Sequence, residues 1–355
     1  LPLCDGFGRQ VSFGIAEELL KLSITYGAED RYPENWLDGI GTKTEKDKRY
    51  EVQYNAQVFA ILAEKLLLDS GVDILYGSYV VAVTTEKDRI TELFVENKSG
   101  RMAYSAATVV DATGDGDVAY RCGAEYEMGN EELGLMQPAT MFFRISNVDT
   151  DRVEADIQAN LHNFYRKNGV NYRSFHWRVT EARENGDWSL DRVSIGLFRM
   201  PKKDEWCVNT SRIMHIDSTN NESLTKAEIE GRRQADEILK FLRKYVPGCE
   251  DARLKSTASY IGIRESRHIK GEYRLTAEDL LSAKVPEDSI LIAANSVDVH
   301  GRFGPKSNEY TPINGSYYGV PYRSLIPLGI DGLLLAGRCI SADSTAAGAI
   351  RVMPP

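Results

Sequence analysis

The stretch VVDATGDGDVAYRCGA, residues 109–124, decides how the chain is interpreted, because it runs an apolar segment into a glycine turn. Gly114, Gly116 and Ala119 satisfy G-x-G-x-x-[G/A], the spacing that lets a backbone approach a pyrophosphate at the start of a helix. A dinucleotide fingerprint also needs a helix long enough to cross a sheet, and Gly123 interrupts this one almost at once. The motif alone therefore does not predict a phosphate loop.

The acidic residues of this stretch leave two other interpretations. Asp115 and Asp117 would lie beside the phosphates of a nucleotide, which like charge disfavours. A calcium loop built from Asp111, Asp115 and Asp117 lacks the spacing and the distal bidentate glutamate of an EF-hand. The remaining interpretation is an acidic turn that ends a buried strand, and on these residues alone we favour it.

The length and the net charge of the chain limit the classes of protein to which it can belong. A chain of 355 residues is long enough for two or three structural units. The formal net charge of -9 gives no electrostatic support for a nucleic-acid or anionic-membrane partner. No run approaches the roughly 18 consecutive apolar residues that cross a bilayer. We therefore expect a small-molecule substrate, no nucleic-acid or membrane partner, and a place in the cytoplasm unless a targeting segment precedes the chain.

The cysteines and histidines give no sign of a metal centre or of a disulfide framework. No C-x-x-C pair occurs, and the five histidines are scattered along the chain. This pattern is typical of a protein in a reducing compartment, and we expect no metal. The cysteines are Cys4, Cys122, Cys207, Cys249 and Cys339.

The first third of the chain alternates helix and strand signals. Apolar residues at helical spacing predict helices over 12–26 and 55–70. Turn residues separate short segments of strand character that follow them. The expected strands are 71–77, 78–85, 89–96, 101–105 and 108–113. A three-stranded meander between a helix and a buried strand predicts an α/β sheet with the meander inserted as a crossover.

The middle of the chain has the pattern of a second structural unit, and the last part again predicts buried strands. Beyond Pro138 we expect a strand over 140–149, a helix over 149–169 and two strands within 193–214. The capping boxes expected to open two later helices pair Thr225 with Glu228, before a helix that ends near Pro247, and Thr276 with Asp279. The domain boundaries that follow are 1–140, 141–288 and 289–355, in which the third piece resumes the sheet of the first.

Five motifs in chain order resemble the FAD-dependent oxidoreductase family, which is similar to fumarate-reductase-like and other glutathione-reductase-type flavoproteins. They are DATGDGDVA (111–119), VNTSRI (208–213), GIRESRHIKGEYRLTAEDL (262–280), VPYRSLIP (320–327) and LLLAGRCISADSTAAGAIRVMPP (333–355). The resemblance covers essentially the whole chain. It implies an α/β FAD/NAD(P)-binding Rossmann-like domain with an inserted β-meander, a second α+β substrate domain, and FAD as cofactor.

The family's phosphate-binding G-x-G-x-x-G turn has no match in this sequence. The resemblance therefore implies that the turn precedes Leu1, and that a helix facing the flavin continues past Pro355. We expect the chain to be part of a longer protein, and GDGDVA to be the end of a second flavin-contacting turn. In that turn the aspartates point away from phosphates or cap the short helix.

The resemblance implies three contacts with FAD. The Ala-Thr-Gly turn packs against the dinucleotide, the A-G-R-x-x-S segment lies near the ribityl chain and pyrophosphate, and the start of the meander meets adenine. The residues that match these positions are Val80, Val81, Ala112, Thr113, Gly114, Gly337, Arg338 and Ser341. For the two valines, simple strand packing is an equally good interpretation.

Basic residues in the matched motifs are the candidates for substrate chemistry. Arginine suits bidentate binding of carboxylates, and histidine is the natural acid or base near neutral pH. We expect Arg264 and Arg323 to orient the substrate and His300, between glycines in DVHGRFGP, to move the proton. Arg267 and His268 belong to the same group. For each of these residues the alternative is a structural salt bridge or a buried interface histidine.

The segment CDGFGRQ (4–10) resembles the family's stretch after its first glycine motif, so Arg9 is a further candidate for the cleft. Cys4 has no partner cysteine nearby, which disfavours a redox role. The function that we expect is hydride transfer between flavin and a small organic substrate. The rival is a non-catalytic flavin-fold protein or a carbohydrate-associated binding protein that uses the same scaffold.

Overall fold

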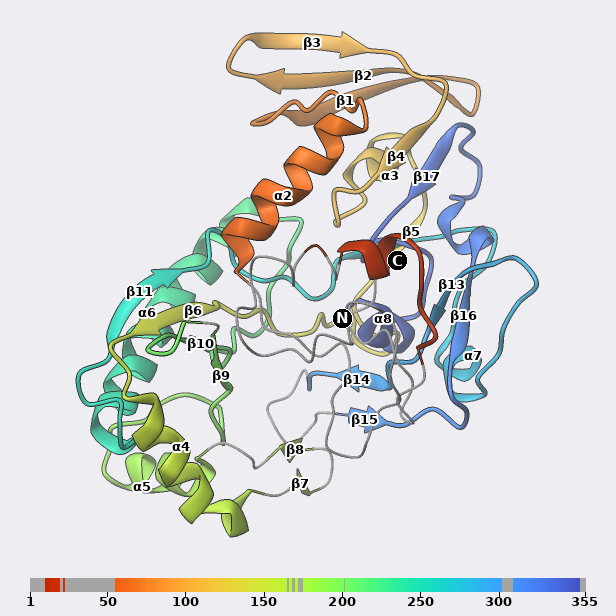
Figure 1. Cartoon of the computed structure of the whole chain (residues 1–355). Coiled ribbons are helices and arrows are strands. Elements are labelled where there is room, and N and C mark those ends of the chain that lie inside the picture. The colour runs from red at the N-terminus through yellow and green to blue at the C-terminus, as the bar shows by residue number, and fades with distance from the viewer. Residues whose placement is uncertain are drawn as a thin grey trace.

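The computed structural model shows a mixed α/β molecule in which several small sheets surround a central helix (Figure 1). The residues that it describes are 10–19, 22, 55–164, 166–167, 170–171, 175–200, 202–301 and 309–351. Within these ranges no helix combines the length and the apolar character needed to cross a membrane. Of the helix expected over 12–26, residues 15–19 are helical, and most of the remainder lies outside the described residues.

The expected meander and the helix before it are both present. Helix α2 (Ala56–Asp69) begins where the Asn55 side chain accepts hydrogen bonds from the first backbone amides. Strands β1 (Tyr79–Glu86), β2 (Arg89–Asn97) and β3 (Gly100–Tyr104) form one antiparallel sheet. In Figure 1 this sheet lies at the top of the molecule with α2 directly beneath it.

The strand expected over 71–77 is wrong. Gly71 and Gly77 both have positive φ, at 78° and 62°, so the segment starts and ends in turn geometry. No described strand pairs with the residues between them, which are mostly exposed. An apolar run without a partner strand for its backbone groups does not form a strand here.

A parallel pair of strands brings together two segments that are far apart in the sequence. Strand β4 (Val109–Asp111) pairs with β17 (Leu333–Leu335), and Asp111 lies opposite Leu335. This pairing confirms that the late strand rejoins the strand of the opening motif. Both strands end at the same edge, where each runs into a turn, and the turn after β4 leads into the five-residue helix α3 (Asp117–Arg121). A helix this short agrees with rejecting a dinucleotide fingerprint.

The middle of the chain builds a four-stranded antiparallel sheet with helices beside it (Figure 1). Its strand order is β11 (Arg253–Thr257), β6 (Phe143–Ser146), β10 (Trp206–Val208) and β9 (Leu197–Arg199). The other elements of this part are α4 (Thr150–Ala159), η2 (Leu161–Asn163), β7 (Arg166–Lys167), β8 (Val170–Asn171), α5 (His176–Glu184) and α6 (Asn221–Tyr245).

The capping box expected at Thr225 is wrong. Helix α6 starts earlier, where the Asn220 side chain accepts a hydrogen bond from the Ser223 amide at 3.0 Å. The Thr225 hydroxyl instead donates to the Asn221 carbonyl within the helix, and Glu228 accepts from the Ile261 amide. The better cap one turn earlier therefore decides the start of the helix.

The rest of the described chain returns toward the first strands. The capping box of Thr276 and Asp279 is confirmed and opens α7. The elements are β5 (Tyr126–Met128), β12 (Arg267–Ile269), α7 (Ala277–Leu281), β13 (Ser289–Ala293), β14 (Val297–Val299), β15 (Glu309–Thr311), β16 (Tyr318–Pro321), η4 (Tyr322–Leu325) and α8 (Ser344–Ile350). Helix α8 is the central helix of Figure 1.

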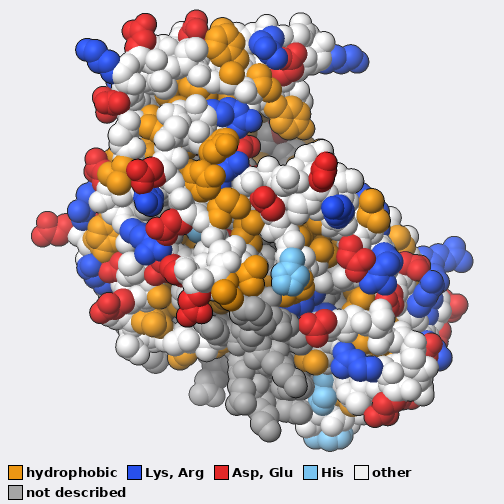
Figure 2. Space-filling model, turned by 180° about the vertical axis from the view of Figure 1, so that it is seen from behind, with side chains coloured by type: hydrophobic (Ala, Val, Ile, Leu, Met, Phe, Trp, Pro, Cys, Tyr) orange, Lys and Arg blue, Asp and Glu red, His pale blue; other side chains and the backbone are white. Residues whose placement is uncertain are grey.

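Two large groups of buried apolar side chains organise these elements. The first combines residues from 90–124 with residues from 269–350, and the second draws only on 143–252. The chain thus leaves its first core, builds a second one and returns. On the face shown in Figure 2, acidic and basic side chains are interspersed, so no large area there carries a single sign of charge.

Candidate functional site

A buried aspartate builds the turn after β4. Asp111 is fully buried, and its carboxylate accepts hydrogen bonds from the amide and the hydroxyl of Thr113 at 3.1 and 2.7 Å. The other carboxylate oxygen accepts from the amides of Val118 and Ala119 at 2.9 Å each, in the first turn of α3. One side chain therefore holds the turn and caps the helix, which is the capping role expected of an aspartate in this stretch.

The turn after β17 closes over the turn after β4. Arg338 pairs with Asp115 at 2.7 Å, and its guanidinium lies across Gly114. A Cβ atom at Gly114 would come within 2.8 Å of Cζ of Arg338, and the φ of Gly114 is 78°. The backbone conformation therefore favours glycine at this position, and a side chain here would displace the Arg338 guanidinium.

These two turns and a set of arginines line a cavity of about 340 Å³. The lining residues are Ala112, Thr113, Gly114, Ile263, Arg264, Ala336, Gly337, Arg338 and Arg351. We call residues 112–114 and 336–338 the glycine-turn wall. The structure brings together six residues that the sequence analysis singled out, including Arg264. At Gly337, with φ 84°, an added Cβ would meet no atom within 4 Å, so the space beside this glycine is open.

Four arginines influence one another electrostatically beside the glycine-turn wall, and we call them the arginine cluster. They are Arg192, Arg212, Arg264 and Arg351. Arg264 and Arg351 line the cavity, and Arg264 donates a hydrogen bond to the Pro138 carbonyl. Burial, followed by the charges of Arg351, Arg192 and Arg212, lowers the pKa of Arg264 to about 9. The charges of the other three arginines therefore act on Arg264.

The other members of the cluster show the same environment. Burial and the charge of Arg192 lower the pKa of Arg212 to about 10, and Arg212 donates to the Gly301 carbonyl. Burial also lowers the pKa of Arg192 and of Arg351. The Nε atoms of these two arginines are buried and have no hydrogen-bond acceptor within the described part of the chain. Each retains donor capacity for a ligand.

His300 lies beside the cluster. Its backbone amide donates to the Gln137 side chain at 3.1 Å, and its Nε2 is 4.0 Å from the Asp298 carboxylate. Burial sets the pKa of His300 well below its usual value, and the charges of Arg264, Arg351 and the other two arginines lower it further. The imidazole is therefore neutral near pH 7 and able to accept a proton.

Arg323, Val80 and Val81 are expected site residues that do not line this cavity. Arg323 forms an exposed ion pair with Asp288 at 3.0 Å, and its guanidinium lies 5.2 Å from the centre of the Tyr273 ring. Val80 packs against the first core, which fits the strand-packing interpretation. Val81 is exposed and is the extra residue of a bulge, because Val80 and Ala82 pair with consecutive residues of β2.

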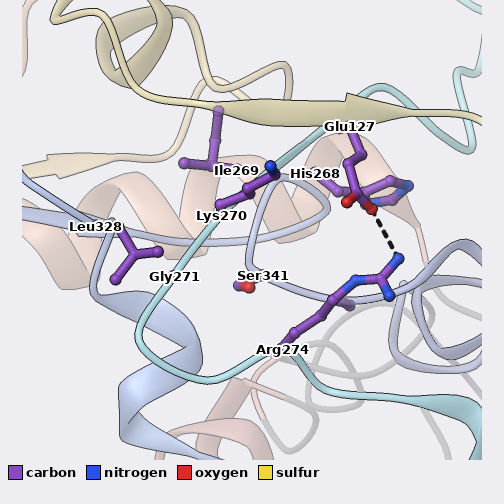
Figure 3. A pocket seen from close by; sticks show the side chains of 9 residues that line it. Glu127, His268, Ile269, Lys270, Gly271, Arg274, Leu328 and Ser341 are labelled. Atoms are coloured by element: carbon purple, nitrogen blue, oxygen red, sulfur yellow. Dashed lines mark hydrogen bonds and ion pairs between the residues drawn. The ribbon is translucent and has the colours of Figure 1, made fainter.

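Ser341 and His268 line a second cavity, of about 130 Å³ (Figure 3). His268 is buried, with its Nε2 3.3 Å from the Glu265 carboxylate, and Arg274 pairs with Glu127 at 2.7 Å across the opening. The backbone of Ser341 donates to Ser324 and accepts from Leu275. The structure therefore gives Ser341 a role in holding the loop before α8 and places it outside the larger cavity.

The remaining candidates divide into structural residues and residues outside the described part. Arg267 pairs with Asp117 at 2.9 Å and lies 4.2 Å from the centre of the Tyr120 ring, as a structural ion pair and cation–π contact would. Arg9 and Cys4 lie outside the described residues. Burial raises the pKa of Cys339 to about 12, so this thiol is unreactive. Within the described ranges no group of three or more His, Cys, Asp or Glu side chains is placed to hold a metal ion.

The sequence analysis missed three arginines of the cluster and the organising role of Asp111. A signal for Asp111 was present, because an aspartate that ends a buried strand before a short helix is a good cap. Arg212 belongs to the motif VNTSRI (208–213), so a signal for it was present, whereas no local signal marks Arg192, which lies in an irregular segment before β9. Arg351 directly follows α8, so recognising that helix is the step that points to it.

Comparison with known proteins gives one family and several remote structures. A family model described as FAD dependent oxidoreductase matches residues 2–355. No curated protein sequence matches the chain significantly.

The solved structures are similar only at low identity. A p-nitrophenol 4-monooxygenase from Pseudomonas putida is 14% identical, covering 63% of this chain and 45% of that one, with a TM-score of 0.36. A myxobacterial chondrochloren halogenase, an FAD-dependent enzyme, is 12% identical over 88% of this chain and 52% of its own, with a TM-score of 0.38. An anhydrotetracycline hydroxylase from Streptomyces rimosus is 11% identical over 76% and 48%, with a TM-score of 0.37. This chain spans about half the length of these proteins.

Proposed function

The chain belongs to the family of FAD-dependent oxidoreductases, and from this premise we propose that the cavity of about 340 Å³ is where a hydride passes between FAD and a small organic substrate. The observation that carries the proposal is the meeting of the two glycine turns and Arg264 around one cavity, with His300 close enough to Arg264 for that charge to lower the His300 pKa. The glycine turns suit a cofactor, and the arginines and histidine suit a substrate.

The glycine-turn wall fits the cofactor. Backbone without side chains at Gly114 and Gly337 allows a close approach, and Arg338 supplies positive charge beside it. Ala112, Thr113, Gly114, Gly337 and Arg338 would hold FAD. Val80 and Val81 would meet adenine at the start of the meander. Ser341 would affect FAD binding indirectly, by holding the loop before α8 in place. When bound, FAD supplies the chemistry of hydride acceptance and donation.

Arg264 and His300 supply the chemistry of the protein itself. Arg264 lines the cavity and orients an anionic group of the substrate. His300, neutral at pH 7, takes a proton from the substrate on its imidazole nitrogen, or returns one in the reverse direction. Asp298, 4.0 Å from Nε2, stabilises the imidazolium that results. Arg323 has no part in this proposal, because it pairs with Asp288 outside the cavity.

The domain organisation that we propose is a Rossmann-like FAD domain in two pieces, 1–140 and 289–355, with a substrate domain over 141–288. The two buried cores support it, because one combines early and late residues and the other lies within the insertion. The first core also takes residues from 269–281, so the return to the FAD domain begins before residue 289. The unpaired thiols of the described residues support a reducing compartment, and we propose the cytoplasm.

The test is the visible spectrum of the purified protein followed by anaerobic bleaching with a panel of small organic substrates. We expect bound FAD, and a loss of turnover of about 10²- to 10⁴-fold in His300→Ala, as for removal of a general base. His162→Ala is the matched control, because His162 is exposed outside the cavity. Colourless protein that ignores added FAD would favour the non-catalytic rival. Full turnover in His300→Ala would remove its assignment.

A further inference from the structure

A buried segment, residues 137–140, lies between the two residues to which the proposed function assigns the substrate chemistry, and we call it the linking segment. At one end of it Thr140 exchanges a pair of backbone hydrogen bonds with Gly262, at 3.1 and 2.8 Å. Gly262 precedes Arg264 closely in the sequence. The pairing therefore fixes the stretch of backbone from which Arg264 projects.

Arg264 and His300 are both hydrogen-bonded to the linking segment, at neighbouring residues. The Arg264 guanidinium donates to the Pro138 carbonyl, and the His300 backbone amide donates to the side-chain carbonyl of Gln137 at 3.1 Å. Arg264 lines the cavity of about 340 Å³, whereas His300 does not. Hydrogen bonds through Gln137 and Pro138 therefore connect His300 to a residue of the cavity wall.

Gln137 is itself fixed by a buried carboxylate. Its backbone amide donates to the Glu265 carboxylate at 2.8 Å, and Glu265 also accepts from the hydroxyl of Ser344, the first residue of α8. Gln137 and Glu265 are only 3% and 1% exposed. Hydrogen bonds to a buried carboxylate are strong, so Gln137 has a well-determined position.

The side-chain amide of Gln137 is only partly paired. Its oxygen accepts from His300, whereas its Nε2 is buried and has no hydrogen-bond acceptor among the described residues. Burying an unpaired donor costs free energy. An apolar side chain of similar length would avoid this cost but would leave the His300 amide without its acceptor. The contribution specific to glutamine at this position is therefore the hydrogen bond to His300.

We propose that Gln137 is a positioning residue, which holds His300 beside Arg264 and thereby sets where the imidazole meets the substrate. This inference rests on the proposed function, because that function assigns the proton transfer to His300. His300 directly follows β14, so a hydrogen bond to its backbone amide determines where its side chain begins. A displacement of about 1 Å at a reacting group can lower a rate about 10²-fold, so one such hydrogen bond can control turnover.

The first experiment follows the His300 imidazole by NMR during a pH titration of the protein with FAD added, and His300→Gln identifies its signal. Burial and the four charges of the arginine cluster hold the pKa of His300 well below its usual value, and the Asp298 carboxylate lies 4.0 Å from its Nε2. Gln137→Met keeps the length of the side chain and removes the acceptor. Because His300 is then free to leave this environment, we expect its pKa to rise toward the usual value.

Thr140→Val is the matched control. It removes the hydrogen bond from the Thr140 hydroxyl to the Ser211 carbonyl in the same buried segment, and it leaves Gln137 in place. We expect the titration of His300 to be unchanged in this variant. A melting curve for each variant shows whether it is folded.

The second measurement is hydrogen exchange at the His300 backbone amide, which also tests the wild type without any variant. In the wild type we expect this amide to exchange about 10²-fold or more slowly than in an unfolded chain. Gln137→Met should lower this protection about tenfold or more. Gln137→Glu keeps an acceptor for the amide and should retain most of the protection.

Turnover distinguishes the positioning of His300 from its proposed role. With the substrate that bleaches the flavin, Gln137→Met should lower kcat about tenfold or more and change KM less than about threefold. An unprotected His300 amide in the wild type would overturn the proposal. So would a Gln137→Met protein in which the titration and protection of His300 match those of Thr140→Val. Altered titration and protection of His300 with full turnover would instead contradict the proposed function.

Discussion

The two sides of the cavity are built in different ways. The glycine-turn wall consists of two short motifs that follow paired parallel strands, and a single carboxylate, that of Asp111, fixes one of them through four hydrogen bonds. The arginine cluster draws its members from four distant segments, and Arg212, Arg264 and Arg351 each donate a hydrogen bond to a backbone carbonyl. The Asp111 carboxylate is hydrogen-bonded within its own turn, whereas the buried Nε atoms of Arg192 and Arg351 have no acceptor among the described residues.

This difference separates stability from binding. Residues of the wall that hold its shape contribute chiefly to the free energy of unfolding, because their polar groups are buried and paired. Desolvation and the charges of neighbouring arginines lower the pKa of Arg264 and Arg212, so we expect these residues to contribute less to the free energy of unfolding. Changes in the wall should therefore destabilise the protein more than changes in the cluster do.

The largest effect is expected from Asp111→Ala. Removing the carboxylate leaves the buried amides of Val118 and Ala119 and the Thr113 side chain without their acceptor. We expect a loss of about 3–5 kcal/mol in the free energy of unfolding, measured by urea denaturation. Asp69→Asn is the control, because Asp69 forms only an exposed ion pair with Lys65 and should have little effect. A small effect of Asp111→Ala would contradict the organising role of Asp111.

Next in size is Gly114→Ala compared with Gly337→Ala. Both glycines have positive φ, but only at Gly114 would the new Cβ meet the guanidinium of Arg338. We expect a loss of about 2–3 kcal/mol at Gly114 and about 1 kcal/mol at Gly337, from the same denaturation experiment. Equal losses at the two positions would show that the contact with Arg338 costs nothing.

A smaller, pH-dependent effect comes from His300. Because its folded-state pKa lies well below the ordinary value near 6.5, the folded protein resists protonation more than the unfolded chain does. This contribution to stability is complete above about pH 6.5 and is lost as the pH falls toward the folded-state pKa. We expect the unfolding free energy of the wild type to fall between about pH 6.5 and 5.5 more steeply than that of His300→Gln. Parallel pH curves would mean that burial and the cluster do not act on His300.

The smallest effect is expected from Arg323→Gln. Arg323 is exposed and pairs with Asp288 outside the cavity. We expect unchanged FAD affinity, unchanged turnover and little change in melting temperature. A strong loss of turnover would restore Arg323 to the substrate site, where the sequence analysis placed it.

The sequence predicted correctly those elements whose formation depends mainly on neighbouring residues. The meander, the cap of α7 and the paired strands before the glycine turns follow from turn residues, capping side chains and apolar runs. The start of α6 was misjudged because Asn220 offers a cap one turn before Thr225. The strand expected over 71–77 failed because strand formation depends on a partner elsewhere in the fold.

The residues of the candidate site also divide into those that local motifs predicted and those that only the fold brings together. Ala112, Thr113, Gly114, Gly337 and Arg338 come together because each belongs to a motif after a strand, and parallel strands end at one edge. The arginine cluster could not be read from the sequence, because an isolated arginine looks the same on a surface as in a cleft. The four arginines come from separate segments of the chain, so only tertiary structure brings them near one another.

The most direct measurement is the dissociation constant of FAD for the wild type, Gly337→Val and Arg323→Gln. A side chain at Gly337 enters open space in the cavity, so we expect Gly337→Val to weaken FAD about tenfold or more. Arg323→Gln should leave FAD affinity unchanged, because Arg323 pairs with Asp288 outside the cavity. Unchanged FAD affinity in Gly337→Val, or a wild type that binds no FAD, would contradict the assignment of the glycine-turn wall to the cofactor.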